Sequence, residues 1–112
     1  MINLIINVTN QRGHLLEYMS VSIKNKFERC KVEMMDIKNG DHASFILSFE
    51  PSFLNTYILE VYFTWDETIE MSADFILSLN SSDCILQYNI DLKPYYCELY
   101  AKGTTRIFSD YD

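Results

Sequence analysis

The chain has 112 residues, 48% of them apolar, and its sixteen acidic residues outnumber nine basic ones to give a net charge of −7. This length and composition predict a single domain over residues 1–112 with a core of its own. The acidity argues against nucleic acid or an anionic membrane as a ligand, because so few cations neutralise few phosphates. No apolar run reaches the roughly 18 residues of a membrane span, and no secretory leader opens the sequence.

Three cysteines, Cys30, Cys84 and Cys97, stand in apolar or alternating contexts where any small apolar residue would also fit. An odd number of widely spaced cysteines favours reduced thiols over a disulfide framework. Together with the missing leader, this predicts a cytoplasmic protein.

The N-terminal part of the chain predicts a strand and then a helix. Ile2 to Val8 alternate between apolar and other residues with the period of two of a half-buried strand. After a turn-rich segment, apolar residues spaced by about four between Leu15 and Phe27 favour a helix over a weaker strand-like alternation.

The next segment reads as a hairpin. Alternation from Cys30 to Ile37 indicates a second strand, and Lys38-Asn39-Gly40-Asp41 is typical of a hairpin turn. The return strand runs over residues 43–49 and is stopped by Glu50-Pro51-Ser52, since proline cannot donate to a strand ladder.

Further strands are expected at residues 57–65, 69–79 and 86–92, with Asn80-Ser81-Ser82-Asp83 as the turn between the last two. Residues 95–102 predict a last strand, and the end of the chain an edge strand or tail. Because short turns join antiparallel neighbours, the fold class we expect is α+β: an antiparallel sheet of about six strands with one N-terminal helix packed on one face. If residues 15–27 are a strand, the alternative is an all-β sandwich.

No catalytic, metal or cofactor motif is evident. His14 and His42 lack a nearby His, Cys or carboxylate at metal-ligand spacing, and Gly13, Gly40 and Gly103 stand singly rather than in a phosphate-binding loop. We therefore expect no catalytic residue, no metal and no cofactor. A dispersed enzyme site built from distant residues is the alternative.

Charge is segregated along the chain. Between Asn39 and Leu92 there is no Lys or Arg, although the segment is strongly patterned as strands. A surface built only for solubility normally mixes both signs. The carboxylates of this segment are Asp41, Glu50, Glu60, Asp66, Glu67, Glu70, Asp74, Asp83 and Asp91.

If the apolar residues of 69–79 face the core, Glu70 and Asp74 share the opposite face, and hairpin pairing sets Asp91 beside them. Exposed tyrosine and tryptophan with carboxylates suit the binding of Lys and Arg. We therefore predict a basic protein partner. The predicted partner-binding residues are Tyr62, Trp65, Asp66, Glu67, Glu70, Asp74 and Asp91.

Trp65-Asp66-Glu67, with Glu70 and Asp74 after it in a strand-rich segment of a small acidic chain, resembles the immunity proteins that neutralise bacterial toxins. The resemblance is to those of contact-dependent growth inhibition and nuclease bacteriocin systems. It implies inhibition of a cognate toxin, usually a basic domain such as a nuclease, by occlusion of its active or substrate-binding surface.

Two other functions remain open. Carboxylates spaced like phosphates would suit a nucleic-acid mimic that inhibits a defence nuclease. Apolar residues on the polar side of the predicted strands (Ile46, Ile58, Ile76 and Ile85) would suit a structural module or a homo-oligomer.

Overall fold

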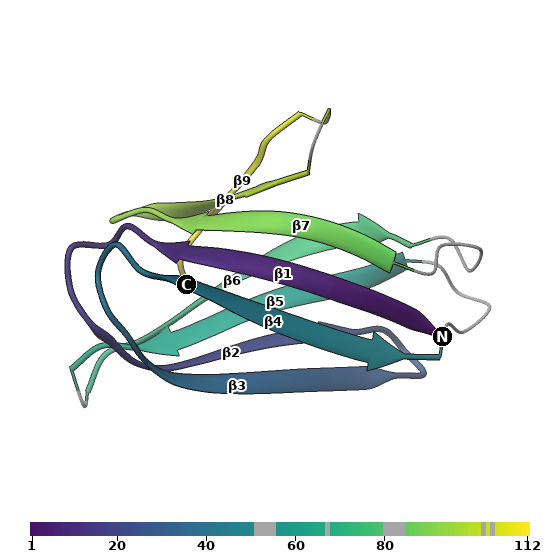
Figure 1. Cartoon of the computed structure of the whole chain (residues 1–112), viewed down its shortest axis with the longest axis horizontal. Helices are drawn as coiled ribbons and strands as arrows, with labels where there is room; N and C mark the ends of the chain where they lie inside the picture. The colour runs from purple at the N-terminus through teal and green to yellow at the C-terminus, as the bar shows by residue number, and fades with distance from the viewer. Residues whose placement is uncertain (51–55, 67, 80–84, 102, 104) are drawn as a thin grey trace.

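In the computed structural model, which describes residues 1–50, 56–66, 68–79, 85–101, 103 and 105–112, the chain forms two packed β-sheets (Figure 1). The strands of the described residues are β1 (Ile2–Asn10), β2 (Leu16–Lys24), β3 (Arg29–Ile37), β4 (His42–Phe49), β5 (Thr56–Thr64), β6 (Glu70–Ser78), β7 (Ile85–Leu92), β8 (Tyr96–Tyr100) and β9 (Ile107–Asp110). One sheet has the order β4-β1-β7-β8-β9 and is called the β1 sheet; the other, β3-β2-β5-β6, is called the β2 sheet. The described residues contain no helix that is long and apolar enough to cross a membrane.

The core lies between the two sheets and follows from the alternation in the sequence. Every second residue of β1 and β4 is buried, as are Leu59, Val61 and Phe63 in β5 and Ala73, Phe75 and Leu77 in β6. Because side chains of a strand alternate between its faces, the intervening residues form the outer faces of the sandwich.

The predicted α+β fold is wrong, and the all-β sandwich given as its alternative fits the structure. Residues Leu16–Lys24 form β2, which pairs with β3 and β5, rather than a helix. Met19, Val21 and Ile23 face the core with the period of a strand, but Leu16 is buried on the other parity. The buried residues therefore change from one parity to the other between Leu16 and Met19, opposite Asp36, whose φ is 57°. This change gave the apolar residues a spacing that resembles that of a helix.

The Asn39-Gly40 turn does not form the predicted hairpin. β3 pairs with β2 in one sheet, while β4 pairs with β1 in the other. The Asp41 amide donates to the Lys38 carbonyl at 3.0 Å, whereas the Gly40 amide donates to Asn10 at 2.7 Å. The turn is therefore bonded to the end of β1 and carries the chain from one sheet to the other.

The strand pairs of the described residues are antiparallel, as expected, with one exception: β1 and β7 pair in parallel from Asn3↔Ile85 to Asn10↔Leu92. β6 and β7 belong to different sheets, so Asp91 does not lie beside Glu70 and Asp74. The turn predicted at 80–83 lies outside the described residues, as do Pro51, Ser52, Cys84 and the end of the strand predicted at 95–102. β8 and β9 stand out from the rest of the sandwich (Figure 1).

Candidate protein-binding face

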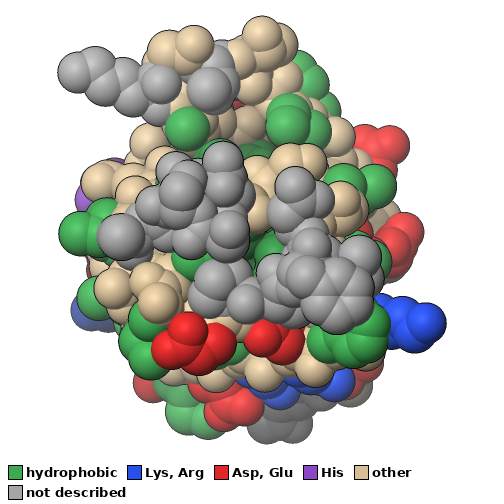
Figure 2. Space-filling view, turned by 90° about the vertical axis from the view of Figure 1, so that its right-hand side faces the viewer, with side chains coloured by type: hydrophobic (Ala, Val, Ile, Leu, Met, Phe, Trp, Pro, Cys, Tyr) green, Lys and Arg blue, Asp and Glu red, His purple; other side chains and the backbone are tan. Residues whose placement is uncertain are grey.

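The outer face of the β2 sheet is a grid of side chains fixed by the strand register. Its rows, read from β3 to β6, are Arg29-Lys24-Ile58-Ile76, Lys31-Ser22-Glu60-Asp74, Glu33-Ser20-Tyr62-Ser72 and Met35-Tyr18-Thr64-Glu70. The β3 side therefore carries two cations, Arg29 and Lys31, and one anion, Glu33, whereas the β6 side carries only anions, Glu70 and Asp74. Both signs also occur around the end of the sandwich shown in Figure 2.

The β6 side holds a group of carboxylates that we call the acidic ridge: Glu60, Glu70, Asp74 and Asp112. Glu60 and Asp74 are cross-strand neighbours, and the Asp112 amide donates to the Ser72 carbonyl at 2.8 Å, which holds the C-terminal residue against β6. Loss of hydration raises the pKa of Asp74, and the Glu60 and Asp112 carboxylates raise it further. The ridge is therefore crowded with like charge.

One ridge carboxylate has a cationic partner in the described part of the chain. Lys24 lies 3.7 Å from Glu60 and also opposes the rise in the pKa of Asp74. Within the described residues, no Lys or Arg lies within 4.0 Å of Glu70, Asp74 or Asp112. These three remain available to a cation from outside.

Tyrosine residues border the ridge. The rings of Tyr18 and Tyr62 meet edge to face with centroids 5.9 Å apart. Desolvation raises the pKa of the Tyr62 hydroxyl, and a hydrogen bond to Glu70 adds to this. Tyr62 thus lies in contact with the ridge through its hydroxyl group.

Three predicted partner-binding residues fall between β5 and β6 in the sequence. Trp65 stacks on His14 with ring centroids 3.6 Å apart, so its ring is engaged within the molecule. Asp66 is exposed and adopts a φ of 73°, a conformation that Asp tolerates in turns. Glu67 lies outside the described residues.

Asp91 lies on the other sheet and is already neutralised. It is 8% exposed and pairs with Glu98 across β7 and β8. Arg106 forms ion pairs with both carboxylates, and the Tyr100 hydroxyl donates to Asp91 at 3.2 Å. Asp91 is therefore separate from the ridge.

The structure thus brings Tyr62, Glu70 and Asp74 onto one face and adds Glu60 and Asp112, which the prediction omitted. Glu60 was detectable, since it shares the outward parity of Tyr62 in its strand. Asp112 carried no signal, because a backbone hydrogen bond from the chain end to β6 leaves no sequence pattern.

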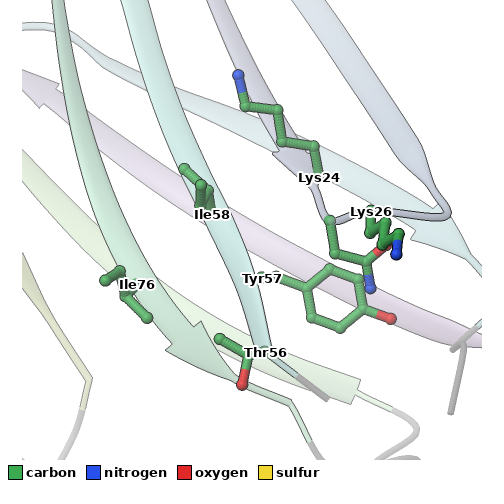
Figure 3. Close-up of a pocket in the computed structure, with 7 residues that line it drawn as sticks. Lys24, Lys26, Thr56, Tyr57, Ile58 and Ile76 are labelled. Carbon is green, nitrogen blue, oxygen red and sulfur yellow. The ribbon is translucent and has the colours of Figure 1, made fainter. Parts of the chain in front are cut away.

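A groove of about 480 Å³ opens beside the ridge (Figure 3). Ile58 and Ile76 form its wall on β5 and β6, and Ile76 is 73% exposed. Its other lining residues are Lys24, Asn25, Lys26, Thr56 and Tyr57. The groove therefore offers an apolar contact next to Asp74.

In the described part of the chain, no three His, Cys, Asp or Glu side chains are placed to hold a metal ion. Cys30 and Cys97 are free thiols, and burial raises the pKa of Cys97 to about 12, so this thiol stays protonated. The sequence matches no protein-family model and no curated protein.

Proposed function

We propose that this protein binds a basic protein partner through the acidic ridge. The observation that carries the proposal is the position of Asp74, a cross-strand neighbour of Glu60 that has no ion pair of its own among the described residues. Its ionised form is disfavoured first by desolvation and then by the Glu60 and Asp112 carboxylates. Such crowding costs folding stability. A partner that places Lys or Arg on the ridge reverses the cost, because its cations attract several carboxylates at once.

More specifically, we propose that the chain is an immunity protein that acts in the bacterial cytoplasm. Its basic partner is a cognate toxin domain such as a nuclease, whose active or substrate-binding surface the β2 sheet covers. A two-sheet scaffold holds the ridge rigidly, so little order is lost on binding. Negative charge on one side of the sheet also speeds the approach of a basic domain.

Capture from a lysate of the native host at low salt tests this proposal. The bait is the wild-type chain, the double variant Glu70→Lys with Asp74→Lys, or the control Glu33→Lys with Asp36→Lys, which makes the same charge change on β3. We expect a protein of basic isoelectric point to be retained by the wild type and the control. The ridge variant loses it, as does the wild type at about 0.3 M salt, where screening is strong.

Equal retention by all three baits would contradict the proposal. If the captured protein is a nuclease, a second arm measures its activity with the chain added. Inhibition of unrelated DNA-binding nucleases as well as the captured one would instead favour nucleic-acid mimicry, since a mimic of DNA is not specific for one cognate partner.

A second candidate function, self-association, is favoured by the outer face of β4, β1 and β7. Ile5 and Ile46 are cross-strand neighbours there, and Ile85 is 70% exposed. The other residues on this part of the face are uncharged: Asn3, Asn7, Ser44, Ser48, Gln87 and Asn89. Two copies of a chain with a net charge of −7 approach best through such a surface.

Sedimentation velocity decides this candidate. A dimer that Ile46→Lys converts to monomer would support it, with Ile76→Lys on the opposite sheet as the control. A monomer at all concentrations would exclude it.

A further inference from the structure

β6 ends the β2 sheet, and its outer edge carries backbone groups without a strand partner. The Ser72 carbonyl points away from β5, since it accepts the Asp112 amide. Backbone groups of alternate residues point to the same side of a strand, so those of Asp74, Ile76 and Ser78 also point outward. In the described residues, no strand pairs with this part of the edge.

The edge already accepts one main-chain hydrogen bond from elsewhere in the chain. The hydrogen bond from Asp112 to Ser72 is a main-chain contact of the kind that a neighbouring strand makes. It involves Ser72, and among the described residues no strand pairs with the stretch from Asp74 to Ser78. This stretch contains Asp74 of the ridge and Ile76 of the groove wall, the latter shown in Figure 3.

The side chains beside the open edge define what a new strand would carry. Asp74 and Ile76 both face outward on the β2 sheet, two positions apart. In a strand added beside β6, the directly opposite side chains would lie about 5 Å away on the same face. A Lys or Arg suits the position facing Asp74, and an aliphatic residue suits the position facing Ile76 and the groove.

We propose that the β6 edge from Asp74 to Ser78 accepts an extended basic segment of the partner as an added strand. This inference rests on the proposed function and specifies how the partner is held. Main-chain hydrogen bonds supply affinity, and the Asp74 and Ile76 contacts select a basic and an aliphatic residue two positions apart. The basic residue comes first in a strand parallel to β6 and second in an antiparallel one. The opposite edge, β3, bears Arg29 and Lys31 on the same face, with Glu33 paired to Lys31 at 3.4 Å, and therefore suits a basic segment less well.

Titration with short peptides tests the inference. The probe is an acetylated and amidated Thr-Ile-Thr-Lys-Thr-Ile-Thr sequence, which places Lys opposite Asp74 and Ile opposite Ile76 in either strand direction, and the control peptide has Glu in place of Lys. We expect the Lys peptide to bind and the Glu peptide not to bind, with the Asp74, Ile76 and Ser78 amides exchanging with solvent more slowly in the complex. A complex in which these amides stay unprotected, or no binding of the Lys peptide, would overturn strand addition.

Substitution of Ile76 separates backbone from side-chain contacts. Ile76→Pro removes an outward amide and leaves the ladder to β5 intact, while Ile76→Ala removes only the side chain. We expect Ile76→Pro to weaken peptide binding at least about tenfold more than Ile76→Ala does. The matched control is Lys31→Pro on β3, which we expect to change nothing.

The outcomes distinguish the two proposals. If reversal of Glu70 and Asp74 abolishes partner capture but Ile76→Pro binds like Ile76→Ala, the ridge binds its partner face-on and strand addition is wrong. Circular dichroism checks that the proline variant is folded; if it is not, the exchange measurement on the wild-type protein decides.

Discussion

Arg12 shows how a single side chain joins distant parts of the sandwich. It is 7% exposed, and its guanidinium lies 5.0 Å from the Phe63 ring centroid and 4.8 Å from that of Tyr111. One of its terminal nitrogens donates to the Pro94 carbonyl at 2.9 Å. A planar cation between two rings fits this place better than an ammonium group does.

Arg12→Lys keeps the charge but loses the planar contact and the reach to Pro94. We expect the free energy of unfolding to fall by about 1–3 kcal/mol. Urea titration followed by fluorescence of the single tryptophan measures it. Arg29→Lys, at an exposed position, is the control and should change stability by less than about 0.5 kcal/mol; equal effects of the two would refute this role of Arg12.

Removing the charge of Asp74 should raise the free energy of unfolding at neutral pH. Its pKa in the folded protein is raised above the ordinary 3.8 by desolvation and then by Glu60 and Asp112. The folded state therefore binds the proton more tightly, and stability from this group is present below pH 3.8 and lost as the pH rises through the folded pKa. At neutral pH the ionised carboxylate is destabilising.

We therefore expect Asp74→Asn to be more stable than the wild type at neutral pH, by less than about 1 kcal/mol since the group is exposed. The advantage shrinks on acidification toward the ordinary pKa and at high salt. Urea unfolding at several pH values measures it. An Asn variant less stable at neutral pH would show that the ridge is not crowded.

At the scale of elements, the turn between β8 and β9 is fastened through Arg106. Asp91 and Glu98 are cross-strand neighbours with little exposure, and Arg106 pairs with both while its guanidinium lies 4.0 Å from the Tyr100 ring centroid. Without Arg106, two shielded carboxylates face one another, which is unfavourable.

Arg106→Met should lower the urea midpoint more than Lys24→Met does. Lys24 pairs with a single carboxylate, Glu60, which is more exposed than the two carboxylates that pair with Arg106. Adding Glu98→Gln to Arg106→Met should recover most of the loss, since one of the opposed charges is then gone. If the double variant is no more stable than Arg106→Met alone, like-charge repulsion is not the cause.

Individual strands were readable from the sequence, whereas their partners were not. Strict alternation identified β1, β4 and β6, because one face of each strand is buried and the other is not. β2 was misread because its buried residues change parity near Glu17, and a four-residue spacing then resembles a helix. The pairing of two successive strands depends on whether the turn between them keeps the chain in the same sheet or carries it to the other one. The Asn39-Gly40 dipeptide indicates a turn but not which of these two connections it makes.

The same limit applies to the candidate site. The outward parity of β6 identified Glu70 and Asp74 from the sequence, and their shared face is confirmed by the register with β5. The location of Asp91 on the other sheet depends on long-range pairing of β7 with β1, which local patterning does not encode. Likewise, the 54 residues that lack Lys and Arg in sequence acquire Lys24 and Arg106 as neighbours in space.

For the whole molecule, charge is divided across one sheet rather than between two halves of the chain. Arg29 and Lys31 lie on the β3 side, and the acidic ridge lies on the β6 side. The outer face of β4, β1 and β7 is nearly free of charge. The proposed function has a basic partner approach β6, and this is its central claim.

The most direct measurement is amide chemical-shift mapping of the isotope-labelled chain during titration with the captured basic protein. The largest shifts should fall on Glu60, Tyr62, Glu70, Asp74 and Asp112, and they should disappear in the variant with Glu70→Lys and Asp74→Lys. Shifts confined to Asn3, Ile46 and Gln87 on the β1 sheet, with the acidic ridge unchanged, would contradict the claim.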